Sequence, residues 1–296
     1  MYRTAALAAT VSLALAMGPA PAPSIDQSRR VDLEAADCSS INMTFGDSET
    51  ARAVQRTSVM MGGAPLELRP DANGGVRIER GAGRAYEITA CIAAGARTMA
   101  DAQAAADSVR LTVEGNRVRV TGVEGERARN WSVQLIVSAP DGASIDALTS
   151  NGPIGVHGVS GTFALRASNG PIALDQVDGT VEARASNGPI SVEGGRGQFD
   201  VETANGPISV RLSGQRWDGR LDARASNGPL TLNVPANYQS GVEVSSSQHS
   251  PWNCRASVCR DGYRNWDERE RSLRIGPDPV VVKLRTVNGP VTINER

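Results

Sequence analysis

Aromatic side chains are scarce in this 296-residue chain: they make up 4% of it, while all hydrophobic types together make up 40%. A core built from this sequence must therefore rely on Val, Ile, Leu and Ala. Glycine, by contrast, is abundant, with 31 residues. A helical bundle needs more Leu and more Lys/Glu pairing, so these proportions favour a thin, turn-rich β architecture.

The chain also lacks an excess of positive charge, because its formal net charge at pH 7 is −1. Proteins that hold nucleic acid by charge gather an excess of Lys and Arg on one surface. We therefore expect no nucleic-acid partner.

The first residues are typical of a secretory leader. Arg3 precedes a short apolar run from Ala5 to Met17, and a Pro-rich stretch of small residues follows as far as Ser24. This run is shorter than the roughly 20 residues that span a bilayer, which leaves an interfacial anchor as the alternative. We expect residues 1–24 to be a signal peptide. The mature chain is then exported to the periplasm, the cell surface or the medium, and is peripheral to a membrane at most.

Four cysteines in an exported chain predict disulfides, and three pairings are open to them. The favoured pairing joins Cys254 to Cys259, which closes a short loop, and Cys38 to Cys91 within the N-terminal half. The competing interpretation is a metal site made by His249, Cys254 and Cys259. That set lacks a fourth ligand and the short paired spacing of zinc sites, so we expect neither a metal nor a cofactor.

A repeated tetrapeptide dominates the second half. Asn-Gly-Pro followed by Ile, Leu or Val occurs six times, beginning at Asn151, Asn169, Asn187, Asn205, Asn227 and Asn288. The first four copies are 18 residues apart, and the gaps that follow are 22 and 61 residues. Alternating apolar residues follow each Pro and precede each Asn. This period of two indicates two short strands per repeat, each with one buried face.

Two topologies fit that pattern. An Asn-Gly pair between alternating runs is a hairpin signal, which would give an antiparallel β meander. The other is a β-solenoid, a single-stranded β-helix in which each repeat is a two-strand coil stacked on the one before. The Pro removes a donor where a tight hairpin ladder would begin. Stacked Asn side chains can hydrogen-bond along a ladder, and Asn and Gly suit a left-handed corner. We expect an all-β solenoid and keep the meander as the alternative.

Weaker copies of the same design occupy the N-terminal half, for example between Leu66 and Ile78. An Ala-rich stretch from Thr98 to Arg110 predicts one helix. We therefore expect a single domain over residues 25–296. Its predicted parts are irregular opening coils (25–144), regular coils (145–244), a disulfide-bearing insertion (245–278) and a final coil (279–296).

The repeat register also assigns the outward side chains. One outward row contains Arg166, Arg184, Arg224 and Arg285, and the row beside it contains Glu182, Asp200 and Asp222. The simpler interpretation is a salt-bridged face that keeps the sheet soluble. The sharper one is an arginine row that grips a repeating anion such as an acidic glycan.

The insertion concentrates three of the chain's few aromatics: Trp252, Tyr263 and Trp266. Long loops on rigid scaffolds often carry binding, so these three are further candidates for ligand contact. The alternative is a solvated loop that its disulfide holds in place.

The usual sequence signals of catalysis are missing together: there is no Gly-x-Ser-x-Gly elbow, phosphate-binding loop or metal-ligand set. Polysaccharide-cleaving solenoids need a carboxylate pair or a carboxylate-bound Ca²⁺. Here the carboxylates recur once per coil among arginines. We expect a non-catalytic protein, with a polysaccharide-cleaving enzyme as the alternative.

The run Ser-Asn-Gly-Pro-Ile-x-Val, the short coil spacing and the leader resemble a bacterial family of "putative adhesins" with a toast-rack, head-domain type β-helix. The resemblance covers about Leu66 to Ile293 and is strongest from Asn151 to Leu232. It implies a right-handed β-solenoid on an envelope-exported protein and brings no catalytic residues. We expect an adhesin-like binding or scaffold role, with an envelope glycan or an envelope protein as the partner.

Overall fold

A computed structural model of the chain describes residues 38, 41–70, 73–122, 130–247, 250–259, 265–267 and 271–296. The predicted leader, residues 1–24, lies outside these ranges. Within them, the structure has no helix with the length and hydropathy needed to cross a membrane.

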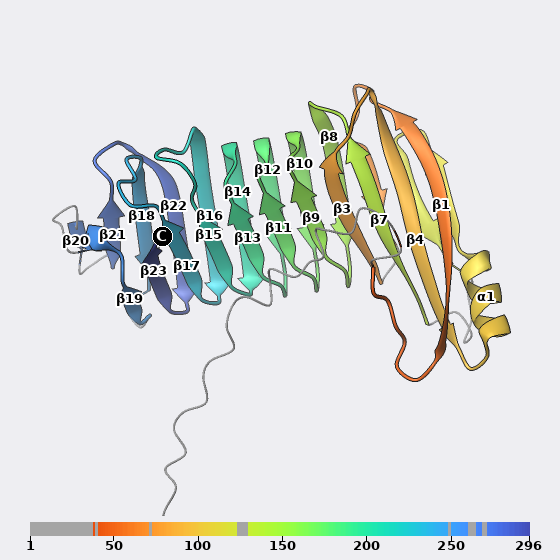
Figure 1. Cartoon of the computed structure of the whole chain (residues 1–296). Helices are drawn as coiled ribbons and strands as arrows, with labels where there is room; N and C mark the ends of the chain where they lie inside the picture. The colour runs from red at the N-terminus through yellow and green to blue at the C-terminus, as the bar shows by residue number, and fades with distance from the viewer. Residues whose placement is uncertain are drawn as a thin grey trace, which may run out of the picture.

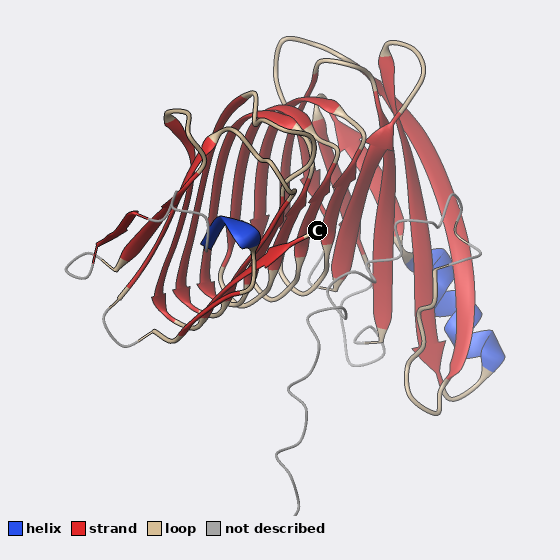
Figure 2. Ribbon diagram, turned by 60° about the vertical axis from the view of Figure 1, so that its left-hand side comes forward, coloured by secondary structure: helices blue, strands red, loops and turns tan. Residues whose placement is uncertain are grey.

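The described chain is almost entirely β-structure, arranged as two large sheets that enclose the core (Figure 1, Figure 2). The all-β prediction is therefore confirmed. In spatial order, sheet A contains β1 (Glu49–Met60), β4 (Ala85–Ala96), β7 (Trp131–Ala139), β3 (Gly74–Arg80), β9 (Ile154–His157), β11 (Ile172–Asp175), β13 (Ile190–Glu193), β15 (Ile208–Arg211), β17 (Leu230–Val234), β23 (Val291–Glu295) and β19 (Trp252–Cys254). Sheet B contains β20 (Asn265–Asp267), β21 (Ser272–Ile275), β18 (Gly241–Ser246), β22 (Val280–Asn288), β16 (Gly219–Asn227), β14 (Arg196–Asn205), β12 (Asp178–Ala185), β10 (Ser160–Ala167), β8 (Ala143–Thr149), β2 (Leu66–Arg69), β6 (Arg117–Thr121) and β5 (Arg110–Glu114).

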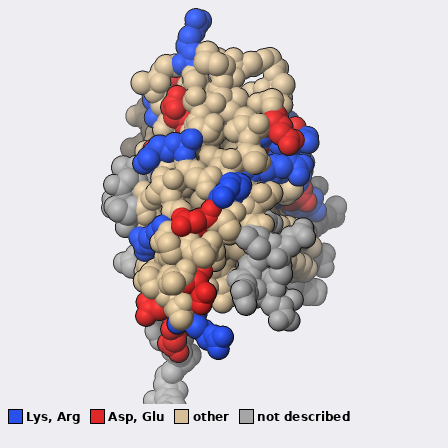
Figure 3. Space-filling view, turned by 90° about the vertical axis from the view of Figure 1, so that its right-hand side faces the viewer, with Lys and Arg blue, Asp and Glu red and all other residues tan. Residues whose placement is uncertain are grey.

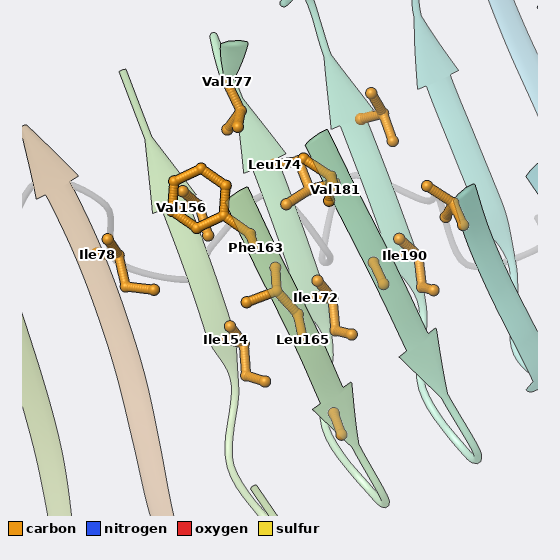
Figure 4. Packing of buried hydrophobic residues seen from close by; sticks show 14 of the residues in the cluster. Ile78, Ile154, Val156, Phe163, Leu165, Ile172, Leu174, Val177, Val181 and Ile190 are labelled. Atoms are coloured by element: carbon orange, nitrogen blue, oxygen red, sulfur yellow. The ribbon is translucent and has the colours of Figure 1, made fainter. Parts of the chain in front are cut away.

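Each regular repeat contributes one strand to each sheet. In sheet B, β10, β12, β14 and β16 pair in parallel and in register, and in sheet A β11, β13, β15 and β17 do the same. The antiparallel meander is therefore wrong for the repeats. Equivalent apolar residues stack from coil to coil between the sheets, as Figure 4 shows for Ile154, Ile172 and Ile190.

The Asn-Gly-Pro corner differs from the expected left-handed turn. Gly188, like the other corner glycines, does not have a positive φ. A Cβ added to it would instead overlap the carbonyl oxygen of Gly170 in the coil before. The left-handed residues lie in the opposite turn of the coil, at Gly158, Gln176 and Gly194, with φ of +65°, +52° and +64°. Glycine is needed at the corner because successive backbones pass too closely for a side chain.

The corner asparagines form a ladder along one side of the stack. Each of the six donates its side-chain N–H to the side-chain oxygen of the asparagine one coil before it in the stack, at 2.9–3.4 Å, and Asn73 is the last acceptor. The donors are Asn288, Asn227, Asn205, Asn187, Asn169 and Asn151. Inside the corner, Thr203 is fully buried and its hydroxyl donates to the carbonyl of Gly188 at 3.0 Å. The polar ladder and the buried hydroxyl both fix the spacing between coils.

The N-terminal end is built differently, because β1, β4 and β7 pair in antiparallel fashion. Helix α1 (Met99–Ser108) packs against β1 and β4 and confirms the predicted helix. The Gln55 side chain links the two sheets: its Nε2 donates to the Val109 carbonyl at 2.6 Å and its Oε1 accepts from the Leu111 N–H at 2.8 Å. Figure 3 views this end, where charged side chains are scattered over a mostly uncharged surface.

At the other end the coils do not follow sequence order. Strand β22 lies between β16 and β18, and β23 lies between β17 and β19. The cysteine-bearing segment therefore contributes the outermost strands of the stack, and the last coil of the sequence lies inside it (Figure 1). A short 3₁₀ helix, η3 (Ser257–Cys259), follows β19.

Both favoured disulfides are confirmed. Cys38 pairs with Cys91 and Cys254 pairs with Cys259, with Cα–Cα distances of 5.3 Å and 6.3 Å. These distances lie in the usual range for a disulfide. Because Cys254 and Cys259 are bonded to each other, they are not available for the metal site considered above, and His249 lies outside the described residues.

Candidate functional site

Two columns of side chains cross the outer face of sheet B in register, one residue per strand. The carboxylate column, as we call it, comprises Glu67, Asp146, Ala164, Glu182, Asp200, Asp222, Lys283 and Glu243. The arginine column comprises Leu148, Arg166, Arg184, Glu202, Arg224, Arg285 and Ser245. Neighbouring strands in a sheet lie about 4.8 Å apart, so each column is a closely spaced row.

Over β8 to β14 the arginines form ion pairs with carboxylates of both columns. Arg166 lies 3.5 Å from Asp146 and 3.5 Å from Glu182. Arg184 pairs with the same Glu182 and lies 3.6 Å from Glu202. Each arginine is thus held between two carboxylates. Exposed ion pairs of this kind contribute about 0–1 kcal/mol each, and they leave little positive charge for a ligand.

The ion pairs continue toward the N-terminal end. Arg69 lies 3.2 Å from Asp146, and the Nε of Arg117 donates to Glu67 at 2.7 Å. This hydrogen bond from Arg117 holds the pKa of Glu67 below its ordinary value. The carboxylate column is therefore occupied by arginines on this side as well.

The pattern changes at β16 and β22. Asp222 lies 3.0 Å from both Arg220 and Arg224, and its side chain is only 12% exposed. On the next strand, Lys283 and Arg285 are exposed, and neither forms an ion pair with a carboxylate among the described residues. The four candidate arginines thus divide: Arg166, Arg184 and Arg224 are ion-paired, and Arg285 is not.

The aromatic candidates of the insertion are placed only in part. The indole Nε1 of Trp252 donates to the Ser246 hydroxyl at 2.6 Å, and the ring packs against the core. Trp252 therefore helps to cover the C-terminal end of the core. Tyr263 and the side chain of Trp266 lie outside the described part of the chain.

The sequence candidates did not include Lys283. A signal for it exists in the repeat alignment, because Lys283 occupies the column in which the coils before it carry Glu182, Asp200 and Asp222. A cation in a carboxylate column marks the coil where the pattern breaks.

The carboxylates considered for a polysaccharide-cleaving enzyme lie on three successive strands. Glu182 contacts two arginines and Asp222 contacts two others, while Asp200 is exposed between them. A glycosidase pair needs one carboxyl that can give up a proton to the leaving group. Two of these three carboxylates are instead engaged by guanidinium groups.

No protein-family model matches the chain, and no curated protein matches it. Among solved structures, a "putative adhesin" from Parabacteroides merdae matches at 9% identity and a TM-score of 0.42, over 82% of this chain and 96% of that chain. A "putative cell adhesion protein" from Clostridium sporogenes matches at 8% identity and a TM-score of 0.29, over 84% of this chain and 100% of that chain. A "putative lipid binding protein" from Parabacteroides distasonis matches at 11% identity and a TM-score of 0.34, over 83% of this chain and 96% of that chain. Two of these names, "putative adhesin" and "putative cell adhesion protein", use the same term as the family that the sequence resembles.

Proposed function

We propose that this chain is a non-catalytic, exported envelope protein that binds an envelope glycan or an envelope protein along the outer face of sheet B. The observation that carries the proposal is the continuity of that face: both columns run in register from β8 to β22. A surface that repeats from coil to coil suits an extended ligand or partner. The arginines that engage Glu182 and Asp222 support a binding role over a catalytic one.

The finer form of the fold that we propose is a right-handed β-solenoid. Two observations support the stacking of repeats as a solenoid: each regular repeat places one strand in each sheet, and equivalent strands pair in parallel. The right hand is what the family resemblance implies. The asparagine ladder adds a hydrogen bond between successive coils at the same corner. A stack of this kind presents the outer face of a sheet to a ligand.

Export to the periplasm or the cell surface belongs to the same proposal. Disulfides form and persist in oxidising compartments, and this chain has two of them, Cys38–Cys91 and Cys254–Cys259. The predicted leader of residues 1–24 gives a route for export.

The test uses the purified mature chain, residues 25–296, mixed with fractionated bacterial envelope and then sedimented. We expect saturable retention by at least one fraction. A matched pair of variants locates the binding face, since Arg224 lies on the outer face of sheet B and Arg211 lies on that of sheet A, 3.2 Å from Glu193. Arg224→Trp should abolish retention and Arg211→Trp should preserve it. Retention by no fraction, or equal loss in both variants, would contradict the proposal.

A further inference from the structure

Charge is unevenly distributed along the outer face of sheet B. Over β8 to β14, the two columns contain more carboxylates than arginines. Over the neighbouring strands β16, β22, β18 and β21 the balance reverses, with five cations and two carboxylates on the outer face. The cations are Arg220, Arg224, Lys283, Arg285 and Arg274, and the carboxylates are Asp222 and Glu243. The C-terminal part of this face is therefore a basic patch on a chain whose net charge is close to zero.

The centre of this patch places like charges side by side. Arg224 and Arg285 are register partners on adjacent strands, so their backbones lie about 4.8 Å apart. Lys283 is two residues before Arg285 and points to the same side of the strand. Like charges directly opposite each other destabilise a sheet. Elsewhere on this face neighbouring arginines share a carboxylate, as Arg166 and Arg184 share Glu182.

The available carboxylates relieve this repulsion only in part. Asp222 is shared by Arg220 and Arg224, and its nearly buried side chain forms no ion pair with Lys283 or Arg285 in the described structure. Asp222 and Glu243 are the register neighbours of Lys283, yet neither forms an ion pair with it in the described structure. Lys283 is also the only lysine of the whole chain, and every other basic side chain apart from histidine is arginine.

We propose that Arg224, Lys283 and Arg285 form a binding site for the carboxylate groups of an acidic polysaccharide. The proposal rests on the assignment of the outer face of sheet B as the binding face and names the ligand class. A planar guanidinium grips a carboxylate with two parallel hydrogen bonds, and an ammonium adds a compact positive charge. Two exposed cations on one strand, beside a third on the next strand, can hold successive carboxylates of a polymer laid along the sheet.

The surroundings of the site favour a polymer over a lipid bilayer. Proteins that lie on a membrane combine basic residues with large apolar side chains that enter the lipid. On strands β16, β18, β21 and β22, the only exposed large hydrophobic side chain among the described residues is Val287, which is 42% exposed. The basic patch therefore lacks the apolar partner that bilayer insertion requires.

The test measures binding of the mature chain to polygalacturonate oligosaccharides by titration calorimetry, with neutral dextran as the control polymer. We expect binding to polygalacturonate that weakens with added salt, and no binding to dextran. The double variant Lys283→Gln/Arg285→Gln should lose at least about tenfold in affinity, since loss of ~1.4 kcal/mol already gives this factor. The matched double variant Arg166→Gln/Arg184→Gln should change affinity by less than about twofold, because those arginines are neutralised by their own carboxylates.

Several results would overturn this site: equal loss in the two double variants, equal binding of dextran, or binding to vesicles of anionic lipid without binding to polygalacturonate. Circular dichroism and thermal unfolding of both double variants establish that each is folded. If the chain is retained by envelope fractions but does not bind polygalacturonate, the site assignment fails and the binding role of the sheet B face stands. If the chain is retained by no envelope fraction and does not bind polygalacturonate, both the binding role of the sheet B face and the site assignment are wrong.

Discussion

The stacking of corner glycines makes a quantitative prediction for Gly188→Ala. The added Cβ would overlap the Gly170 carbonyl oxygen, and backbone atoms in stacked coils cannot rotate away as a side chain can. Relief requires the coils to separate at this corner, where the N–H of Asn187 donates to the coil before at 2.8 Å and the N–H of Ile190 donates to the coil after at 3.0 Å. Each such bond contributes about 1 kcal/mol net. We expect Gly188→Ala to lower the free energy of unfolding by about 2–3 kcal/mol.

A matched glycine separates this steric cause from backbone strain. Gly158 has a φ of +65°, and a Cβ added there would meet nothing within 4 Å. Gly158→Ala should therefore cost only the left-handed penalty of about 1–2 kcal/mol, and Gly158→Asn should cost less because Asn tolerates that conformation. At Gly188, Asn should be no better than Ala. Urea unfolding followed by circular dichroism gives these free energies. If the free energy of unfolding of Gly188→Ala lies within about 0.5 kcal/mol of the parent's, or if Gly188→Asn is clearly more stable than Gly188→Ala, close backbone contact is not what requires glycine at this corner.

Three other changes test separate parts of the structure. Gln176→Gly should raise stability by about 0.5–1 kcal/mol in urea unfolding, because Gln176 has a φ of +52° that glycine adopts without strain. Tyr238→Phe should be neutral or mildly stabilising at pH 7, since the buried Tyr238 hydroxyl makes no hydrogen bond of good geometry. Burial raises the pKa of Tyr238 from 10.0 to about 12, so the unfolded chain loses this proton first and stability falls as pH rises from 10 to 12. The difference between parent and Tyr238→Phe across that range should reach no more than about 2–3 kcal/mol, and a constant difference would contradict it. Arg184→Ala should change stability by less than about 0.5 kcal/mol despite its two ion pairs, and a loss above about 1.5 kcal/mol would show that the columns stabilise the fold.

The repeat pattern was sufficient to predict which residues face the core and which face solvent. Strand alternation has a period of two, and parallel coils of equal length keep that register from one repeat to the next. Phe163, Val181 and Phe199 accordingly stack in the interior, and the outward columns align as the sequence predicts. The inward and outward faces follow from local alternation, so they can be predicted from a single sequence.

The conformation of the corner was not encoded in the same way. A glycine required by a left-handed φ and a glycine required by a close backbone neighbour look identical in a single sequence. The distinction depends on the distance between Gly188 and Gly170, which is a property of the stacked coils. The expected left-handed residues lie instead in the turn that contains Gly158 and Gln176.

The order of the last coils also could not be derived from strand periodicity. Both β18 and β22 alternate, and either could pair with β16. One signal did exist, because Asn288 carries the corner motif and the coil of β18 does not. Only Asn288 can continue the ladder from Asn227, to which it donates at 2.9 Å.

The sequence predicted where the candidate side chains lie, but it did not predict which of them are neutralised by ion pairs. The sequence placed Arg166 and Arg184 in an outward row, but the ion pairs that neutralise them depend on side-chain conformations on neighbouring strands. The same dependence explains why Lys283 and Arg285 emerge as the unneutralised pair only in the folded structure.

The chemistry of Lys283 makes it possible to test directly whether the basic patch of sheet B is the ligand-binding face. Because the chain has no other lysine, an amine-acetylating reagent modifies this side chain and the N-terminal amine alone, and mass spectrometry separates the two. We expect saturating polygalacturonate to slow acetylation of Lys283 and to leave the rate at the N-terminal amine, the internal standard, unchanged. An unchanged rate at Lys283 while polygalacturonate is bound, or equal slowing at both amines, would contradict this expectation.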